Sequence, residues 1–358
     1  SLNRTEHQVH ASPVSASTTR SRKIHLKRLE KLRKMDRIQF LSYIWSQKYG
    51  KNVAKQMAKA HRISTIRQHQ SSWNTFKAWL PEKVKILTTK IALKFFLYLA
   101  NFRNLAPKTV ISYRTALSVP LKHGFNINVN DEPFALISRS HFLENPPKKK
   151  LVPEWNLNAV LKNFASPTYS LEAPFLNRFL RTIFLVALAT GNRVSELTNA
   201  SRIGLRESDV SIIIPVRSNF LFKNQTVNRS PPPIECLALD HQSPLCPVAA
   251  LKEYVAATNN VDHNGRLFVH PKTGKPLASG RLNYWLCKAI QEGDPESHAR
   301  AHDIRKFGWS SAWERGTSMQ EIIQGGFWQS QNVFINKYLV NSTPLQVSCV
   351  AGRRRIVI

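Results

Sequence analysis

The sequence predicts a mainly α-helical protein with a small β-sheet, divided into two domains. A chain of 358 residues is longer than one hydrophobic core usually serves, so two domains are the default expectation. Apolar residues recur at helical spacing in several segments, whereas VSIIIPV and IECLALD are patterned as strands. Between the two parts, ENPPKKKLVPEW combines prolines with consecutive lysines, which is typical of a linker, so we place the domain boundary near residue 150.

The N-terminal domain is expected to contain three helices. Ser64 can cap the first of them, and Pro81 ends it. The second runs from about Thr89 to Ala100, and the third begins near Pro107, because proline suits a first helical turn. In the C-terminal domain, FLRTIFLVALATG is expected to form a buried helix.

The ends of the chain differ from these domains in composition. Residues 1–21 are rich in Ser, Thr and His without periodicity, which indicates a disordered arm. The basic stretch from Ser21 onward is compatible with a helix that serves as a nuclear-localisation patch, as a DNA-gripping helix or only as a solvated face. The expected segments are a basic N-terminal arm and helix (1–60), a helical domain (61–145), a linker (146–153), a second domain (154–340) and a C-terminal tail (341–358).

Charge indicates a polyanionic partner. The 52 Lys and Arg residues exceed the 22 Asp and Glu residues, which gives a formal net charge of +30 and a pI near 10.4. The first 150 residues hold 29 basic and 7 acidic residues, against 23 and 15 in the rest, so the N-terminal part is expected to grip a nucleic-acid backbone. A hydrophobic content of 42% with eight Trp residues argues against a short basic protein of the ribosomal type.

The remaining composition excludes several classes. The four cysteines form no CxxC pair, so neither a zinc ribbon nor a disulfide framework is indicated, and a reducing intracellular compartment fits best. No apolar run is long enough for a membrane span, and the first thirty residues lack the apolar core of a secretory signal. The chain begins with Ser, which suggests a fragment or a processed product. No cluster of acidic residues indicates a metal site, and we expect no cofactor.

The first motif with chemical content is ATGNRVSELTNA. Gly191 and Asn192 are expected to turn the chain out of a buried helix and to present Arg193, with Glu196 one helical turn further on. A guanidinium stays charged and can donate two hydrogen bonds to a phosphate, which lysine cannot copy. Taken alone, the pair of Arg193 and Glu196 is more often a local structural ion pair.

Two further motifs complete a set suited to phosphoryl transfer. In AHDIRKFGWSSAW, His302 and Arg305 are three residues apart and share a helix face. In GGFWQSQNVFINKYL, paired glycines permit a tight turn before Trp328, and a helix carries Tyr338 ten residues later. Each motif has an ordinary explanation, a satisfied histidine beside a surface arginine or aromatic residues in a core, but their order and combination point to one active site.

In this order the motifs resemble the catalytic domain of the tyrosine recombinase family, which includes the phage integrases and Cre recombinase, over about residues 185–339. Trp328 stands where many bacterial members carry His, and the spacing to the tyrosine is ten rather than the usual nine. FWQSQNVFINKYL, HRISTIRQHQSSWNTFKAW and PEWNLNAVL are similar to the recombinases of eukaryotic DIRS and Ngaro retrotransposons, which extends the resemblance to about residues 60–340.

The resemblance implies a metal-independent DNA strand transferase. Tyr338 would be the nucleophile of a 3′-phosphotyrosyl intermediate, and Arg193, Arg305 and Trp328 would stabilise the transition state. His302 would be an acid/base partner, and Glu196 would support the arginine or the histidine. The general acid of the family is a hairpin lysine, for which we choose Lys223 in IIIPVRSNFLFKNQTVNRSPPPIECLALD. Arg217 or Arg229 remain alternatives for that role, and Lys223 also has the explanation of an ordinary exposed hairpin lysine.

The resemblance also implies an architecture and partners. A helical core-binding (SAM-like) domain and a catalytic domain would form a C-shaped clamp on double-stranded DNA, and four protomers would act on two DNA sites. The tail, with Arg353 to Arg355, would pack on a neighbouring protomer. A eukaryotic mobile-element recombinase would integrate DNA in the nucleus. The DNA-binding residues we expect are Lys108, Arg114, Lys148, Lys149 and Lys150.

Two other functions share these residues. One is a domesticated, sequence-specific DNA-binding protein that has lost catalysis, against which the intact catalytic set argues. The other is a type IB topoisomerase, which relaxes one duplex without exchanging partners. The small helical N-terminal domain and the compact motif spacing favour a recombinase.

Overall fold

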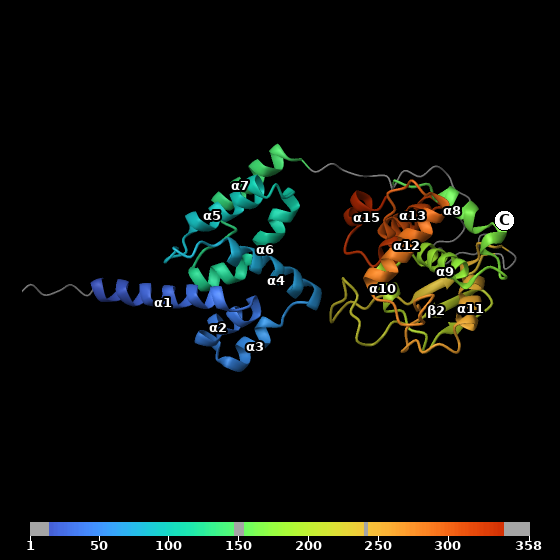
Figure 1. Ribbon diagram of the computed structural model, residues 1–358, viewed down its shortest axis with the longest axis horizontal. Helices are drawn as coiled ribbons and strands as arrows, with labels where there is room; N and C mark the ends of the chain where they lie inside the picture. The colour runs from blue at the N-terminus through green and yellow to red at the C-terminus, as the bar shows by residue number, and fades with distance from the viewer. Residues whose placement is uncertain (1–13, 147–153, 240–242, 340–358) are drawn as a thin grey trace, which may run out of the picture. The chain divides into compact units, whose positions relative to one another are not determined.

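The computed structural model describes residues 14–146, 154–239 and 243–339 (Figure 1). The chain divides into two compact units, residues 1–149 and 150–358, and each unit has its own hydrophobic core. The expected class, mainly α with a small β-sheet, is confirmed. No helix in the described parts of the chain has the length and apolar character that a membrane crossing demands.

The described part of the N-terminal unit is all helical. Its helices are α1 (Val14–Lys34), α2 (Arg37–Tyr49), α3 (Lys51–Ala58), α4 (Ile63–Trp79), α5 (Thr89–Leu97), the π-helix η1 (Tyr98–Phe102), α6 (Pro107–Phe125) and α7 (Glu132–Glu144). Pro107 takes the first position of α6, as expected, and Thr88, whose role was not predicted, caps α5 through Ile91 N–H. The expected cap at Ser64 is wrong, because α4 already begins at Ile63 and Arg62 precedes it without a side-chain cap.

Residues 21–60 belong to the same core as the helices that follow them. Phe40 of α2 is fully buried, with ring centroids 5.2 Å from Trp73 of α4 and 5.9 Å from Phe125 of α6. Asp36 and Gln39 form a reciprocal capping box at the start of α2. The structure therefore joins the segment we set apart as an arm and helix to the helical unit, and α1 begins inside the stretch expected to be disordered.

The C-terminal unit surrounds a three-stranded antiparallel sheet with helices. Its elements are α8 (Leu157–Phe164), the 3₁₀ helix η2 (Pro167–Tyr169), α9 (Phe175–Thr190), α10 (Val194–Thr198), β1 (Arg206–Glu207), β2 (Ser211–Ile214), β3 (Ile234–Leu237), α11 (Pro247–Ala257), α12 (Ser279–Gly293), α13 (Ala301–Glu314), α14 (Met319–Gly325) and α15 (Gln331–Lys337). The strand order is β1-β2-β3, with Ile212 opposite Cys236. β2 and β3 lie in the two segments predicted as strands, whereas the two-residue β1 was not predicted.

Helix α9 is the centre of this unit. Its residues from Phe179 to Thr190 are all buried, and α11, α12, α13 and β3 pack against it. A helix that is apolar on all sides is stable only when other elements cover it all round. Because α9 ends directly before Gly191 and α13 packs beside it, the core brings the first two motifs together.

Phe40→Ala is expected to lower the free energy of unfolding of the N-terminal unit by about 3–5 kcal/mol, because a fully buried ring loses its contacts with Trp73 and Phe125. Val53→Ala, at a half-exposed position of α3, is the matched control and should change it by less than about 0.5 kcal/mol. Urea unfolding of the full chain followed by circular dichroism measures both. Equal midpoints for the two variants would mean that residues 21–60 are a separate arm.

Candidate active site

The first site loop leaves the core at Gly191. This residue ends α9 with a φ of +56°, a left-handed conformation that glycine adopts without strain. A Cβ at this position would lie 2.4 Å from Trp309 Nε1. Glycine is therefore required both by the turn and by the indole packed against it.

Arg193 and Glu196 form the local ion pair at the start of α10. Arg193 Nη1 donates to Glu196 Oε1 at 2.6 Å, and the main-chain N–H of Arg193 donates to Glu196 Oε2 at 2.8 Å. The Glu196 side chain is 2% exposed, whereas the Arg193 side chain is 12% exposed. A guanidinium has five N–H donors, so this pairing is compatible with a phosphate contact.

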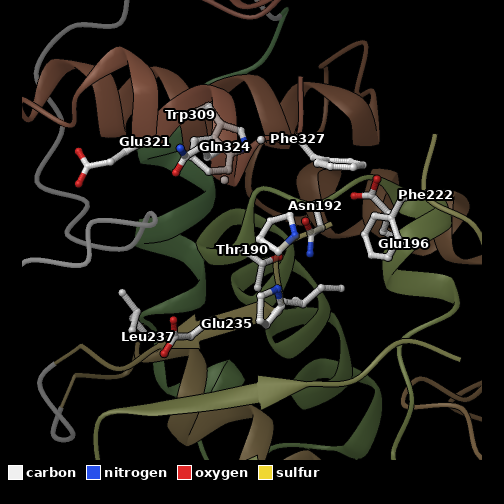
Figure 2. Close-up of a pocket in the computed structure, with 15 residues that line it drawn as sticks. Thr190, Asn192, Glu196, Phe222, Glu235, Leu237, Trp309, Glu321, Gln324 and Phe327 are labelled. Carbon is white, nitrogen blue, oxygen red and sulfur yellow. The ribbon is translucent and has the colours of Figure 1, made fainter. Parts of the chain in front are cut away.

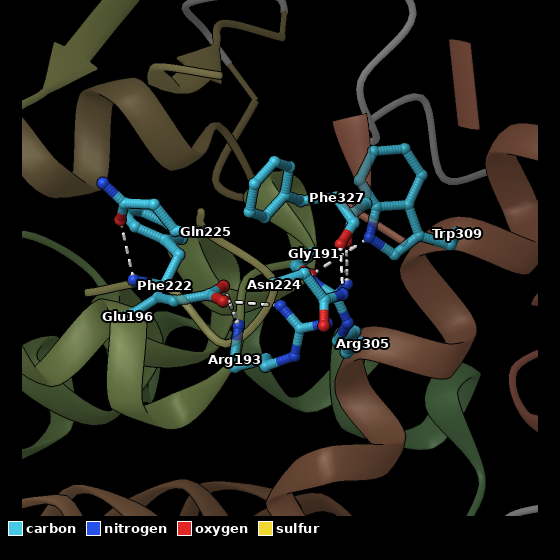
Figure 3. Close-up of polar contacts among 10 residues, drawn as sticks. Gly191, Arg193, Glu196, Phe222, Asn224, Gln225, Arg305, Trp309 and Phe327 are labelled. Atoms are coloured by element: carbon cyan, nitrogen blue, oxygen red, sulfur yellow. Dashed lines mark hydrogen bonds and ion pairs between the residues drawn. The ribbon is translucent and has the colours of Figure 1, made fainter. Parts of the chain in front are cut away.

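Arg305 of α13 connects two loops from inside the core. It is 2% exposed, and its terminal nitrogens donate to Gly191 O and Gly326 O (Figure 3). Its guanidinium carbon lies 4.7 Å from the centroid of the Trp328 ring and 5.4 Å from the centroid of the Tyr338 ring. The expected phosphate-binding arginine thus also has a structural role, because it ties the first loop to the third.

Burial is the main cause that lowers the pKa of Arg305 to about 10, and the positive charge of Arg193 lowers it further. The Glu196 carboxylate and the Tyr338 hydroxyl act in the opposite direction. A pKa near 10 leaves Arg305 cationic at neutral pH. A full positive charge therefore lies against the ring of the candidate nucleophile, Tyr338.

The paired glycines make room for two indole rings. A Cβ on Gly325 would lie 2.4 Å from the Trp309 ring, and one on Gly326 would lie 2.2 Å from the Trp328 ring. The left-handed conformation falls on Phe327 instead, with a φ of +49°. The glycines were expected to allow a tight turn, but the structure shows that they are needed because the rings lie so close.

Tyr338 lies at the end of α15 against two of the predicted site residues. Its ring centroid is 5.4 Å from that of His302 and 4.7 Å from that of Trp328. It is 8% exposed, and its main-chain oxygen accepts a hydrogen bond from Ser310 Oγ at 3.0 Å. The indole N–H of Trp328 is buried and has no hydrogen-bond partner among the described residues, so it is an available donor that lacks an acceptor.

His302 reaches the surface of this cluster, yet its pKa is lowered to about 4. Desolvation is the largest cause, and the positive charges of Arg305 and Lys306 add to it, whereas Asp303 opposes them. The ring is therefore uncharged at neutral pH. In that state one of its nitrogens can accept a proton.

Lys223 is exposed in the turn between β2 and β3, as the family pattern implied. Its neighbours hold this turn against Phe327, because Asn224 Nδ2 donates to Phe327 O at 2.7 Å and the Phe222 ring lies 6.2 Å from the Phe327 ring. No hydrogen bond or ion pair joins the Lys223 side chain to the rest of the site within the described residues. The main chain of Lys223 nevertheless lies beside the segment that carries Trp328.

A cavity of about 200 Å³ adjoins the cluster (Figure 2). Trp309 and Phe327 lie on one side of it, and Glu235 and Leu237 of β3 lie on the other. Glu196 also lines the cavity, so one wall is shared with the Arg193 loop. In the described residues, no group of three or more His, Cys, Asp and Glu side chains is arranged to hold a metal ion.

The expected DNA-binding residues have different surroundings. Lys108 is exposed in the first turn of α6. Arg114 is half-buried and donates to Ser138 Oγ at 3.2 Å and to Phe134 O at 3.5 Å, so part of its guanidinium holds α7. Lys148, Lys149 and Lys150 lie outside the described residues, as does the tail with Arg353 to Arg355.

Two side chains matter more to the site than the sequence indicated. Trp309 Nε1 donates to Gly191 O at 3.0 Å, so this indole supports the first loop. Arg229, considered only as an alternative to Lys223, donates through Nη2 to Trp328 O at 2.5 Å. In the sequence, this close packing was indicated only by the glycine and tryptophan residues that these motifs share.

The fold is that of the tyrosine recombinases. The chain is similar to the Tn1549 transposon integrase in complex with transposon right-end DNA, with a TM-score of 0.57, 10% identity and coverage of 86% of this chain and 96% of that one. It is also similar to the XerH site-specific recombinase bound to palindromic difH substrate (TM-score 0.56, 13% identity, 88% and 94% covered). A lambda integrase dimer bound to a COC′ core site gives 0.54 and 14%, with 90% and 79% covered.

No protein-family model matches the chain, and no curated protein matches it in sequence. At identities of 10–14% these structural similarities establish the fold.

The ring protons of His302 are expected to titrate near pH 4 in NMR spectra, because partial desolvation of the ring and the neighbouring cations Arg305 and Lys306 disfavour the charged form. Since this pKa lies below the ordinary 6.5, the unfolded chain takes up a proton first, and His302 makes stability fall as the pH drops from about 6.5 to 4. His302→Gln assigns the resonance and should remove that part of the pH dependence. A midpoint at or above pH 6 would contradict the desolvated position.

Proposed function

We propose that this protein is a site-specific DNA recombinase or integrase that cuts and rejoins DNA strands through a 3′-phosphotyrosyl intermediate. One observation carries the proposal: the ring of Tyr338 lies against Arg305, His302 and Trp328 within the fold of the tyrosine recombinases. An attacking hydroxyl needs a base within reach, and the imidazole of His302 lies against the Tyr338 ring.

In the proposed reaction the Tyr338 oxygen attacks the scissile phosphorus. A bond forms between this oxygen and phosphorus, and the bond from phosphorus to the 5′ oxygen breaks. His302, uncharged at neutral pH, accepts the phenol proton, and Lys223 donates a proton to the leaving 5′ oxygen. A 5′-hydroxyl of another strand reverses the step, so the energy of the broken bond is conserved and no ATP is consumed.

Charge that develops on the non-bridging oxygens needs donors in place before the reaction. Arg193 at the start of α10 and the unpaired indole N–H of Trp328 are suited to this task, and Arg305 supplies a fixed positive charge. Glu196 holds Arg193 in position through its hydrogen bonds.

We propose double-stranded DNA as the partner, bound through its phosphates. The net charge of +30 supports this, and Lys108, Arg114, Lys148, Lys149 and Lys150 are the contacts we propose for the helical unit and the linker. Exchange between two duplexes involves four strands, which favours a tetramer on two DNA sites. The similarity of FWQSQNVFINKYL to retrotransposon recombinases supports a role in mobile-element integration in a nucleus.

Wild-type protein incubated with a library of nicked duplexes should form a denaturation-resistant adduct with DNA, whereas Tyr338→Phe should form none, because phenylalanine has no attacking oxygen. Gel electrophoresis detects the adduct, and sequencing of its DNA identifies the cleaved sites. Tight, salt-sensitive binding by both proteins without an adduct would favour the inactive DNA-binding protein. Relaxation of one supercoiled circle without exchange between two sites would favour a topoisomerase.

Each protomer is expected to cleave with its own tyrosine, since Tyr338 is packed against His302 and Trp328 of the same chain. A mixture of Tyr338→Phe and Arg193→Ala should therefore form no more adduct than Arg193→Ala alone. Wild-type protein mixed with Tyr338→Phe controls for mixed assembly and should still cleave. Adduct formation restored in the first mixture would show that the tyrosine is supplied by a partner protomer.

A further inference from the structure

We propose that Arg229 is a positioning residue: by docking the loop of Lys223 onto the Phe327–Trp328 segment, it places Lys223 for proton transfer during strand cleavage. The inference rests on the proposed function and deepens it. It assigns a task to a side chain that the catalytic set does not contain.

Two side chains of the lysine loop donate hydrogen bonds to two consecutive peptide carbonyls. Arg229 Nη2 donates to Trp328 O at 2.5 Å, and Asn224 Nδ2 donates to Phe327 O at 2.7 Å. The Arg229 guanidinium carbon also lies 4.4 Å from the centroid of the Phe327 ring, within range of a cation–π contact. We call Asn224 and Arg229 the loop clamp; Figure 3 shows its Asn224 beside Phe327.

The loop between Asn224 and Arg229 is closed by hydrogen bonds within its own main chain. Thr226 and Arg229 exchange main-chain hydrogen bonds of 3.2 Å in both directions, and Val227 at the tip is fully exposed. Lys223 directly precedes Asn224 and is exposed itself. The position of its ammonium group therefore depends on how the loop is docked rather than on packing around its own side chain.

The segment that the clamp grips is held independently of it. The Trp328 main-chain N–H donates to Ile323 O at 3.0 Å, Gly326 O accepts from Arg305, and the Phe327 and Trp328 side chains are buried. Loss of the Arg229 side chain should therefore free the exposed loop and leave the buried segment in place. The effect on chemistry then passes through Lys223.

The same contacts give Arg229 a role that needs no direct contact with the phosphate. Its guanidinium donates a hydrogen bond to Trp328 O and lies with one face over the Phe327 ring. Displacement of a catalytic group by about 1 Å can cost up to about 10²-fold in rate, so a docking contact of this kind is enough to matter.

The test uses single-turnover cleavage of a duplex recovered from the adduct experiment, made with either oxygen or sulfur at the scissile 5′ bridging position. On the oxygen substrate, Lys223→Ala should be slower than wild type by about 10²–10⁴-fold and Arg229→Ala by about 10–10²-fold. A thiolate leaves without a proton because its conjugate acid is far stronger than an alcohol, so both variants should cleave the sulfur substrate within about threefold of wild type.

Three further variants separate positioning from other roles. Lys223→Ala combined with Arg229→Ala should be no slower on oxygen than Lys223→Ala alone, since the two residues act on one step. Arg229→Lys, which keeps a donor for Trp328 O, should recover part of the rate. Val227→Ala, at the exposed tip of the same loop, is the matched control and should cleave like wild type.

The outcomes are distinct. Three results overturn the inference while the proposed function stands. They are rate losses of the two single variants that multiply in the double variant, a sulfur substrate that Arg229→Ala still cleaves slowly, and a wild-type cleavage rate for Arg229→Ala on oxygen. Weakened DNA binding by Arg229→Ala with unchanged single-turnover chemistry also overturns it and assigns Arg229 to DNA contact. Absence of wild-type cleavage on both substrates overturns the proposed function, and this inference with it.

Discussion

The main-chain oxygen of Gly191 is the acceptor on which the arrangement of the site depends. Arg305 and Trp309, one turn apart on α13, both donate to it. Arg305 extends to Gly326 O with its other terminal nitrogen, so one buried guanidinium joins the end of α9 to the loop after α14. A buried charge without a carboxylate in direct contact is costly, and two carbonyl dipoles, an indole face and a tyrosine ring offset that cost here.

A second constraint is the space that the indoles occupy. Gly191 and Gly325 are both in close contact with the Trp309 ring, and Gly326 is in close contact with the Trp328 ring. Interiors packed to this density transmit small displacements. A shift of one loop is therefore passed to the other, and the spacing between Arg193 and Tyr338 depends on the packing of the Trp309 and Trp328 rings.

Much of this arrangement could be predicted from the sequence, and the failures have physical causes. The buried helix α9, the strands β2 and β3, and the meeting of Arg193, His302, Arg305, Trp328 and Tyr338 follow from apolar patterning and from motif order. The inclusion of residues 21–60 in the helical core depends on contacts of Phe40 with residues 33 and 85 positions away, which local periodicity does not reveal. The burial of Arg305 and the attachment of Arg229 depend on main-chain carbonyls, and no residue type signals where those lie.

Phe327 has a backbone conformation that glycine or asparagine would adopt at lower cost. A left-handed φ on a bulky residue costs about 1–2 kcal/mol, and Phe327 bears that cost while its ring packs against Phe222 and Arg229. Burial of this ring, which is 5% exposed, contributes more to stability than the strain removes, so glycine or asparagine here would lower the free energy of unfolding and also remove the surface on which the lysine loop rests. The same side chain therefore serves both stability and turnover, and a laboratory variant that relieves the strain at Phe327 would lose on both counts.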